Sequence, residues 1–307
     1  SCLVGSEMCI RDSIKGAITA LATPMKIDGS LDFSSLEKLI EFQISEGING
    51  LVAVGTTGES ATVDVEEHLE IISFFIKISN NRVPIIAGTG ANSTKEAIEL
   101  TKEARDLGAD AALLVSPYYN KPTQEGLFRH FTEIANQVDI PQIIYNVPSR
   151  TASNIDVNTI KRLCTNPNII GVKDATGDLK VFDEIKKNCI EEIESDNFSL
   201  FSGDDETSFE FISRGGHGTI SVTSNILPNM IAKMCEAASN DSDDLQEMKI
   251  RLEKINKLLF VESNPIPVKF ALKNMGLIDE GIRLPLTWLD HKFHHEIKEE
   301  LNKLDLI

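Results

Sequence analysis

The feature that most constrains this sequence is a unit that recurs along it. A short, apolar, β-rich run ends in glycine or polar residues, and a stretch with helical periodicity follows. The predicted strands lie at 17–21, 50–54, 84–87, 111–115, 142–145, 169–173, 198–201 and 218–222. The predicted helices between them lie at 33–46, 65–79, 94–107, 124–137, 157–163, 179–187 and 205–214. Strands that alternate with helices, and are apolar throughout, indicate a parallel sheet buried on both faces.

This pattern predicts an α/β fold, a (β/α)₈ TIM barrel over residues 14–227. A doubly wound open sheet is the alternative, but it usually has fewer strands. Residues 228–307 carry no strand pattern and have helical stretches at 229–238, 244–261, 267–274 and 291–304. We predict a C-terminal helical subdomain there, packed on the barrel because no Gly-Pro-Ser linker precedes it.

The first residues, 1–13 (SCLVGSEMCIRDS), lack the basic start, long apolar stretch and cleavage site of a secretory signal. They resemble the in-frame translation of a transposon-end sequencing adapter. We interpret them as a non-native tail and expect no targeting segment in the rest of the chain.

Composition narrows the classes of partner. The net charge of -17 disfavours nucleic acid and anionic membranes. Outside the tail the cysteines are Cys164, Cys189 and Cys235, widely spaced and without a CxxC pair. We therefore expect neither a disulfide framework nor a zinc site, and a reducing cytoplasm as the location.

A lysine, Lys173, closes the apolar run of the sixth predicted strand. Burial of an ammonium is costly, and the cost falls when the amine gives up its proton. A neutral lysine is a nucleophile that forms Schiff bases with ketones. Taken alone, a lysine that ends a strand more often reaches into solvent.

Other polar residues follow the predicted strands, where barrel enzymes hold their active sites. They are Thr23, Thr56, Thr57, Thr89, Tyr118, Tyr119, Tyr145, Asp204 and Ser221. This set contains no histidine, no carboxylate pair and no metal-ligand cluster, so it argues against metal hydrolysis and against a Ser-His-Asp arrangement. It favours imine chemistry at Lys173, with tyrosine and threonine hydroxyls that move protons.

The turn Gly55-Thr-Thr-Gly-Glu-Ser60 follows a strand and is expected to open a helix, so that its backbone amides form an anion site. The GxxxxGK spacing of a phosphate-binding loop is missing. The expected anion is therefore a small carboxylate.

Several motifs, in order from about Gly16 to the C-terminus, resemble those of the dihydrodipicolinate synthase family, within the pyruvate-dependent class I aldolases. They are Thr23-Pro24, Gly55-Thr-Thr-Gly-Glu-Ser60, Ala87-Gly-Thr-Gly-Ala-Asn92, Pro117-Tyr-Tyr-Asn120, Tyr145-Asn-Val-Pro-Ser-Arg150, Gly171-Val-Lys-Asp-Ala-Thr-Gly177, Ser202-Gly-Asp-Asp205, Gly215-Gly-His-Gly-Thr-Ile-Ser-Val222 and Asn264-Pro-Ile-Pro-Val-Lys269. Each motif is modestly specific, and their order along one chain is very specific.

The resemblance implies a reaction. Pyruvate forms an imine with Lys173, and the derived enamine attacks L-aspartate 4-semialdehyde. No cofactor and no metal are implied beyond this covalent imine. Tyr145 is implied as the acid/base, with Thr56 and Tyr119 as proton relays. Four further residues are implied as substrate-binding: Thr57 for the pyruvate carboxylate, Arg150 for the carboxylate of the aldehyde, and Gly203 and Ile220 through backbone groups.

The resemblance also implies an assembly and a regulatory site. Tyr119 is the family residue that reaches into a neighbouring subunit, so a homo-oligomer, a dimer of dimers, is expected. L-Lysine is implied as a feedback inhibitor, bound through Ser60, Ala61, His68, Asn92, Glu96 and Tyr118. Val65 departs from the pattern, because many lysine-inhibited relatives have a histidine there.

Two alternatives stay open at this point. N-acetylneuraminate lyases and 2-keto-3-deoxy acid aldolases share the lysine, the turn and the tyrosine. The Tyr118-Tyr119-Asn120 run and Arg150 favour the smaller aldehyde. A barrel that binds keto acids or lysine without catalysis is the other alternative, although Lys173, Tyr145 and Thr56 are all present.

Overall fold

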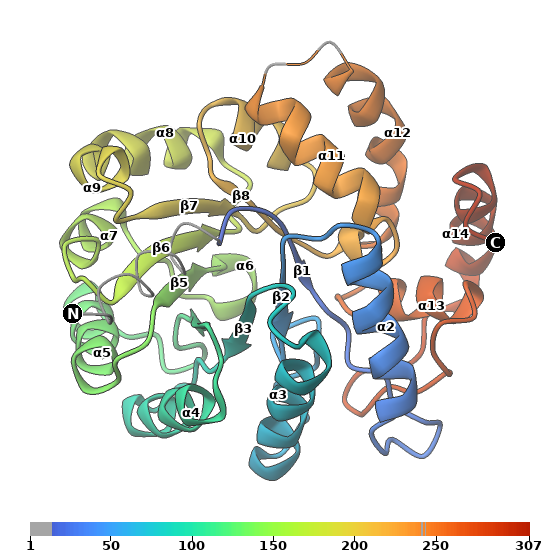
Figure 1. Ribbon diagram of the computed structural model, residues 1–307, viewed down its shortest axis with the longest axis horizontal. Coiled ribbons are helices and arrows are strands. Elements are labelled where there is room, and N and C mark those ends of the chain that lie inside the picture. Colours follow the sequence, from blue (N-terminus) through green and yellow to red (C-terminus); the bar gives the residue numbers. More distant parts are fainter. Residues whose placement is uncertain (1–13, 241, 243) are drawn as a thin grey trace.

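The structure, a computed structural model, describes residues 14–240, 242 and 244–307. The adapter-like tail predicted at 1–13 lies outside the described residues. Eight parallel strands close into one barrel in sequence order (Figure 1). They are β1 (Gly16–Ala20), β2 (Gly50–Ala53), β3 (Ile85–Gly88), β4 (Ala111–Val115), β5 (Gln142–Asn146), β6 (Ile169–Asp174), β7 (Ser199–Ser202) and β8 (Gly218–Ser221). The predicted (β/α)₈ barrel is confirmed.

The barrel closes where β1 pairs with β8, with Gly16 opposite Gly218 and Ile18 opposite Ile220. Gly218 lets the two backbones approach closely, since a Cβ at this position would lie 2.1 Å from the carbonyl oxygen of Gly16. Inside, Ile18, Ile220 and Phe201 belong to one buried apolar cluster. The interior is therefore a packed core, and any site must lie above it.

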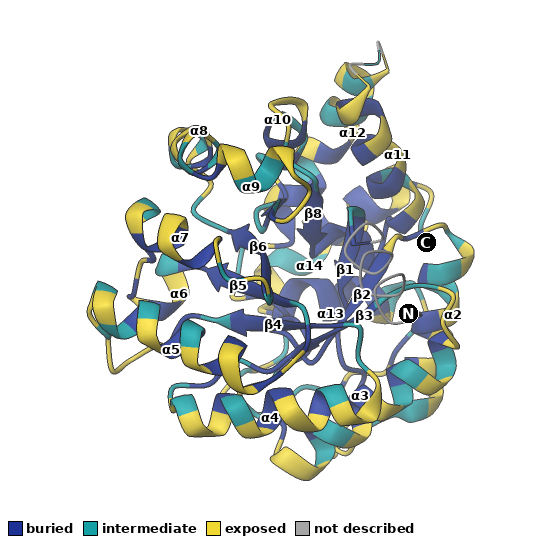
Figure 2. Ribbon diagram, turned by 60° about the vertical axis from the view of Figure 1, so that its left-hand side comes forward, coloured by how far each residue is buried: buried dark blue, intermediate teal, exposed yellow. Residues whose placement is uncertain are grey.

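Helices surround the strands and expose only their outer faces (Figure 2). The ring contains α2 (Phe33–Ser45), α3 (Val65–Ser79), α4 (Thr94–Leu107), α5 (Gln124–Gln137), α7 (Val157–Leu163), α8 (Leu179–Asn188) and α10 (Ser208–Ser213). Side-chain caps fix several of their starts; for example, Asp64 and Glu67 form a capping box at α3. Three short elements were not predicted: α6 (Pro148–Thr151), α9 (Ile190–Glu194) and the 3₁₀ turn η1 (Thr223–Asn225).

The C-terminal part consists of α11 (Pro228–Ser239), α12 (Leu245–Leu258), α13 (Ile266–Asn274) and α14 (His291–Lys303). Helix α11 packs on β1 and on α10, which is the place of the eighth barrel helix. The domain boundary at residue 227 stays a prediction. The packing of α11 on β1 and α10 favours including this helix in the barrel.

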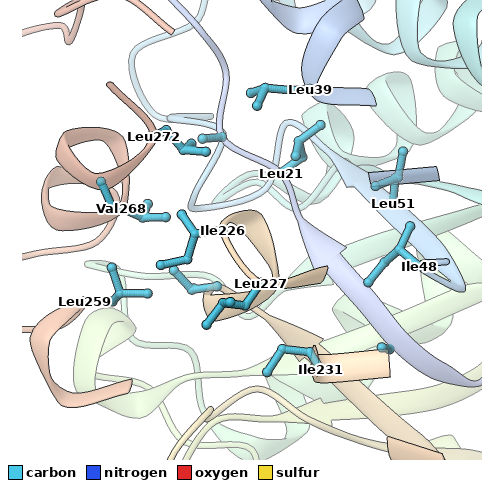
Figure 3. Close-up of a cluster of buried hydrophobic side chains, with 14 of the residues drawn as sticks. Leu21, Leu39, Ile48, Leu51, Ile226, Leu227, Ile231, Leu259, Val268 and Leu272 are labelled. Carbon is cyan, nitrogen blue, oxygen red and sulfur yellow. The ribbon is translucent and has the colours of Figure 1, made fainter. Parts of the chain in front are cut away.

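The C-terminal helices share a core with the barrel. Val268 and Leu272 of α13 lie in one buried cluster with Leu21 and Ile226 (Figure 3). This cluster holds the segment around α13 over the carboxyl end of the strands. Within the described residues, no helix is both long and apolar enough to cross a membrane.

We predict that Gly218→Ala lowers the free energy of unfolding by about 1–3 kcal/mol, because the added methyl group meets the β1 backbone at the seam of the barrel. Gly50→Ala at the start of β2 is the matched control. Its Cβ would meet neighbours at ordinary contact distances, 3.4 Å and longer, so we expect a change below about 1 kcal/mol. Urea denaturation measures both, and equal changes would contradict this account of the seam.

Candidate active site

A cavity of about 170 Å³ opens at the carboxyl ends of the strands. Six of the predicted site residues line it: Thr56, Thr57, Tyr145, Arg150, Lys173 and Gly203. Phe260 and Asn264, which lie between α12 and α13, also line it. The cavity therefore combines strand-end residues with a contribution from the C-terminal part, which the sequence did not predict.

Lys173 lies near the end of β6, directly beside Tyr145 of β5 in the sheet register. Its side chain is buried, and the Nζ atom lies 4.2 Å from the centroid of the Tyr145 ring. It forms no ion pair within the part of the chain that the structure describes. Burial lowers the pKa of Lys173 from the ordinary 10.5 to about 7; the negative charge of Asp205 opposes this shift, and the positive charge of Arg150 adds to it. A substantial fraction of this amine is thus neutral near pH 7.

Tyr145 is also buried, and burial raises the pKa of its phenol. The positive charge of Arg150 and a hydrogen bond with Thr56 act in the opposite direction. The phenol therefore keeps its proton at neutral pH and can donate it to a group bound at Lys173.

Gly203 allows the lysine chain to lie where it does. A Cβ at this position would approach the Cε atom of Lys173 to 2.8 Å. The other residue predicted to line the pocket through its backbone, Ile220, has its side chain in the barrel core. Val222, two residues further along, lines the cavity.

The turn Gly55–Ser60 is held from several sides. Thr23 donates a hydrogen bond to the carbonyl oxygen of Gly58 at 2.8 Å. Asn264 donates to the Thr57 hydroxyl at 2.9 Å. The prediction that this turn opens a helix is wrong, because α3 begins beyond it, at Val65, after the cap residue Asp64.

Several strand-end residues serve structural contacts. The Thr89 and Thr101 hydroxyls are hydrogen-bonded to each other at 2.8 Å. The Ser221 hydroxyl accepts a hydrogen bond from the backbone amide of Ser224. Asp204 lines the cavity and accepts a hydrogen bond from Thr207 at 2.7 Å. The position of a residue after a strand therefore did not by itself tell which side chains reach the cavity.

Tyr119 lies outside the cavity. Its side chain is 90% exposed, and its φ of 67° lies in the left-handed region that is uncommon for a residue with a side chain. The predicted relay through Tyr119 is therefore not complete within one chain.

A second cavity, of about 400 Å³, adjoins the first and shares Thr56 and Arg150 with it. Three residues predicted for lysine binding line it: Ser60, Ala61 and Tyr118.

The other three residues of that set differ in their surroundings. Asn92 accepts a hydrogen bond from the backbone amide of Tyr118 at 2.8 Å. His68 is buried, with Nε2 2.7 Å from the carbonyl oxygen of Gly88, and Glu96 is exposed in the first turn of α4. The structure thus groups four residues of the set around this cavity.

The described residues contain no group of three or more His, Cys, Asp or Glu side chains that could hold a metal ion. Cys164, Cys189 and Cys235 are free and buried.

The fold and this site define a class. A buried amine with a lowered pKa lies beside a protonated phenol at the mouth of a (β/α)₈ barrel, which is the arrangement of a Schiff-base lyase of the class I aldolase type.

Comparison with known proteins identifies the family within this class. The model of the dihydrodipicolinate synthetase family matches residues 13–304, and the chain belongs to this family. It is 52% identical to the 4-hydroxy-tetrahydrodipicolinate synthase of Methylococcus capsulatus, over 96% of this chain and 100% of the relative.

Solved structures agree with this assignment. The chloride-inhibited dihydrodipicolinate synthase of Acinetobacter baumannii, complexed with pyruvate, superposes with a TM-score of 0.92 at 49% identity, covering 96% of this chain and 100% of that one. A dihydrodipicolinate synthase from Cyanidioschyzon merolae with lysine bound has a TM-score of 0.91 at 36% identity, covering 96% and 99%.

The lowered pKa of Lys173 has a measurable consequence. We expect kcat/KM for pyruvate to rise with pH up to about 7 and then level off, because only the neutral amine attacks a ketone. Circular dichroism over the same pH range is the control for folding. A rate that keeps rising toward the ordinary pKa of lysine, with the fold intact, would contradict the assignment.

Proposed function

We propose that this chain condenses pyruvate with L-aspartate 4-semialdehyde to give 4-hydroxy-tetrahydrodipicolinate, the first committed step of the diaminopimelate route to lysine. The main support for the proposal is the buried amine of Lys173, which forms no ion pair with any described residue and lies against the ring of Tyr145. The name that relatives at about half identity share supports the choice of substrates.

The reaction begins at Lys173. Its neutral amine adds to the keto carbon of pyruvate, and loss of water leaves an imine. Tyr145 protonates the departing oxygen and regains a proton through Thr56, with which its phenol is hydrogen-bonded. A methyl proton then leaves to solvent through the same hydroxyls, and the enamine forms. Lys173 itself supplies the electron sink, so the proposed chemistry requires no added cofactor.

The second half of the reaction uses the outer part of the cavity. The enamine carbon attacks the aldehyde, and the amino group of the second substrate cyclises and releases Lys173. Arg150, which lines this cavity, provides a planar donor for the carboxylate of the aldehyde. Thr57 and its neighbouring amides bind the carboxylate of pyruvate.

The lining of the cavity favours this substrate pair over a sugar acid, because Arg150 offers a planar donor to a carboxylate on the second substrate. The presence of Lys173, Tyr145 and Thr56 in one cavity also favours an enzyme over a silent binding protein.

We further propose that the active form is a homo-oligomer, with Tyr119 completing the proton relay of a second copy. The exposure of its side chain away from its own cavity supports this assignment. Whether the assembly is a dimer or a dimer of dimers stays a prediction.

A coupled assay tests the function. We expect product from pyruvate and L-aspartate 4-semialdehyde and no cleavage of N-acetylneuraminate. Tyr145→Phe should lower kcat by about 10²–10⁴, the usual worth of a positioned acid/base group, while the melting temperature stays close to the parent value. Cleavage of neuraminate without condensation would reject the proposed substrates.

L-Lysine is the proposed feedback ligand of the second cavity. We expect millimolar L-lysine to inhibit the condensation and D-lysine to inhibit it less. Tyr118→Phe should weaken inhibition by removing the hydroxyl of a residue that lines this cavity. If L-lysine leaves the rate unchanged at these concentrations, the regulatory assignment is wrong.

A further inference from the structure

A second lysine, Lys269 of α13, is buried even more deeply than Lys173, and it is paired. Its ammonium forms an ion pair with Glu59 of the turn Gly55–Ser60, and both side chains are fully enclosed. The other carboxylate oxygen of Glu59 accepts a hydrogen bond from the backbone amide of Arg283 at 3.2 Å. Because both ions lose their hydration, such a pair is a weak source of stability. An apolar pair of similar volume could fill the same space, but it would not fix the direction of the Glu59 side chain.

The pair acts on the part of the turn that faces the cavity. The backbone amide of Glu59 donates to the carbonyl oxygen of Thr56 at 3.1 Å, and that of Ser60 donates to Gly55 at 3.3 Å. Glu59 has a φ of 60°, a left-handed conformation that is unfavourable for a residue with a side chain. The attraction of Lys269 for its carboxylate therefore helps hold a backbone conformation that the turn would not favour on its own.

The helix that carries Lys269 is anchored independently of this pair. Its neighbours in α13, Val268 and Leu272, pack into the core cluster beside Leu21 (Figure 3). Loss of the ammonium would therefore leave α13 packed against the core, while the turn would lose one of the contacts that fix its conformation.

We propose that Lys269 is a positioning residue. Through Glu59 it holds the turn Gly55–Ser60 so that Thr56 faces Tyr145 and Thr57 faces the carboxylate of pyruvate. The inference rests on the proposed function. Lys269 does not line the cavity, so it acts through the turn and not on the substrate.

The experiment compares Lys269→Met with the double variant Lys269→Met/Glu59→Gln, which leaves no unpaired buried charge. Lys254→Met is the control for loss of an ion pair away from the cavity. Lys254 of α12 lies 3.4 Å from the mostly buried Glu300 of α14, and its own side chain is 42% exposed. For each protein, the melting temperature is measured. The fraction of chain that borohydride traps as the pyruvate adduct is then followed against pyruvate concentration.

We expect Lys269→Met to melt at a lower temperature and to need about 10–100 times more pyruvate for half-maximal trapping, the effect of a displaced binding group. The double variant should regain melting temperature but not pyruvate affinity. Lys254→Met should lose little melting temperature and no pyruvate affinity, because partly exposed ion pairs contribute little.

Other outcomes would overturn the inference. If affinity returns with stability in the double variant, or if Lys254→Met loses as much affinity, Lys269 has only a structural role. Should Lys269→Met fail to fold, the double variant alone decides between these results. Failure of the parent protein to form any adduct would reject the proposed function instead, so the two failures remain distinct.

Discussion

The site depends on the exclusion of water from the side-chain amine of Lys173. Lys173 lies near the end of a strand inside a closed barrel and is almost fully buried, and no carboxylate among the described residues forms an ion pair with it. Its ammonium form is therefore disfavoured, and its pKa falls to about 7. Lys269 provides the contrast within the same chain. Burial lowers its pKa too, but the charge of Glu59 and a hydrogen bond to that carboxylate oppose the shift. One lysine is kept as a nucleophile and the other as a structural ion.

The other residues at the carboxyl ends of the strands are arranged around that amine. The barrel core beneath it blocks the interior, and Gly203 leaves room for the lysine chain. Tyr145, whose phenol pKa is raised by burial, lies against the amine on the neighbouring strand. The C-terminal part supplies Asn264, which holds the turn that carries the threonine hydroxyls. Substrate carboxylates would then enter a small cavity that already contains their donors, which reduces the cost of orienting them.

Much of this could be predicted from the sequence, because strand and helix periodicity are local properties. The eight strand predictions overlap the observed strands, and helices such as α3 and α4 were predicted to the residue. The inward direction of Lys173 agrees with the chemistry expected of it. The contribution of Asn264 and Lys269 could not be predicted, since it depends on contacts between segments about 200 residues apart. The one signal in the sequence for this contact was Lys269, a lysine within the apolar run of α13. The exposure of Tyr119 and the start of α3 beyond the turn also depend on tertiary structure.

The most direct test of the central claim is mass spectrometry after incubation with pyruvate and borohydride at neutral pH. Each chain is expected to gain the mass of one reduced pyruvyl group, and peptide mapping should place this group on Lys173. Lys173→Met, folded by circular dichroism, should gain none. A folded parent protein whose mass does not change, or an adduct on a different lysine, would contradict the claim.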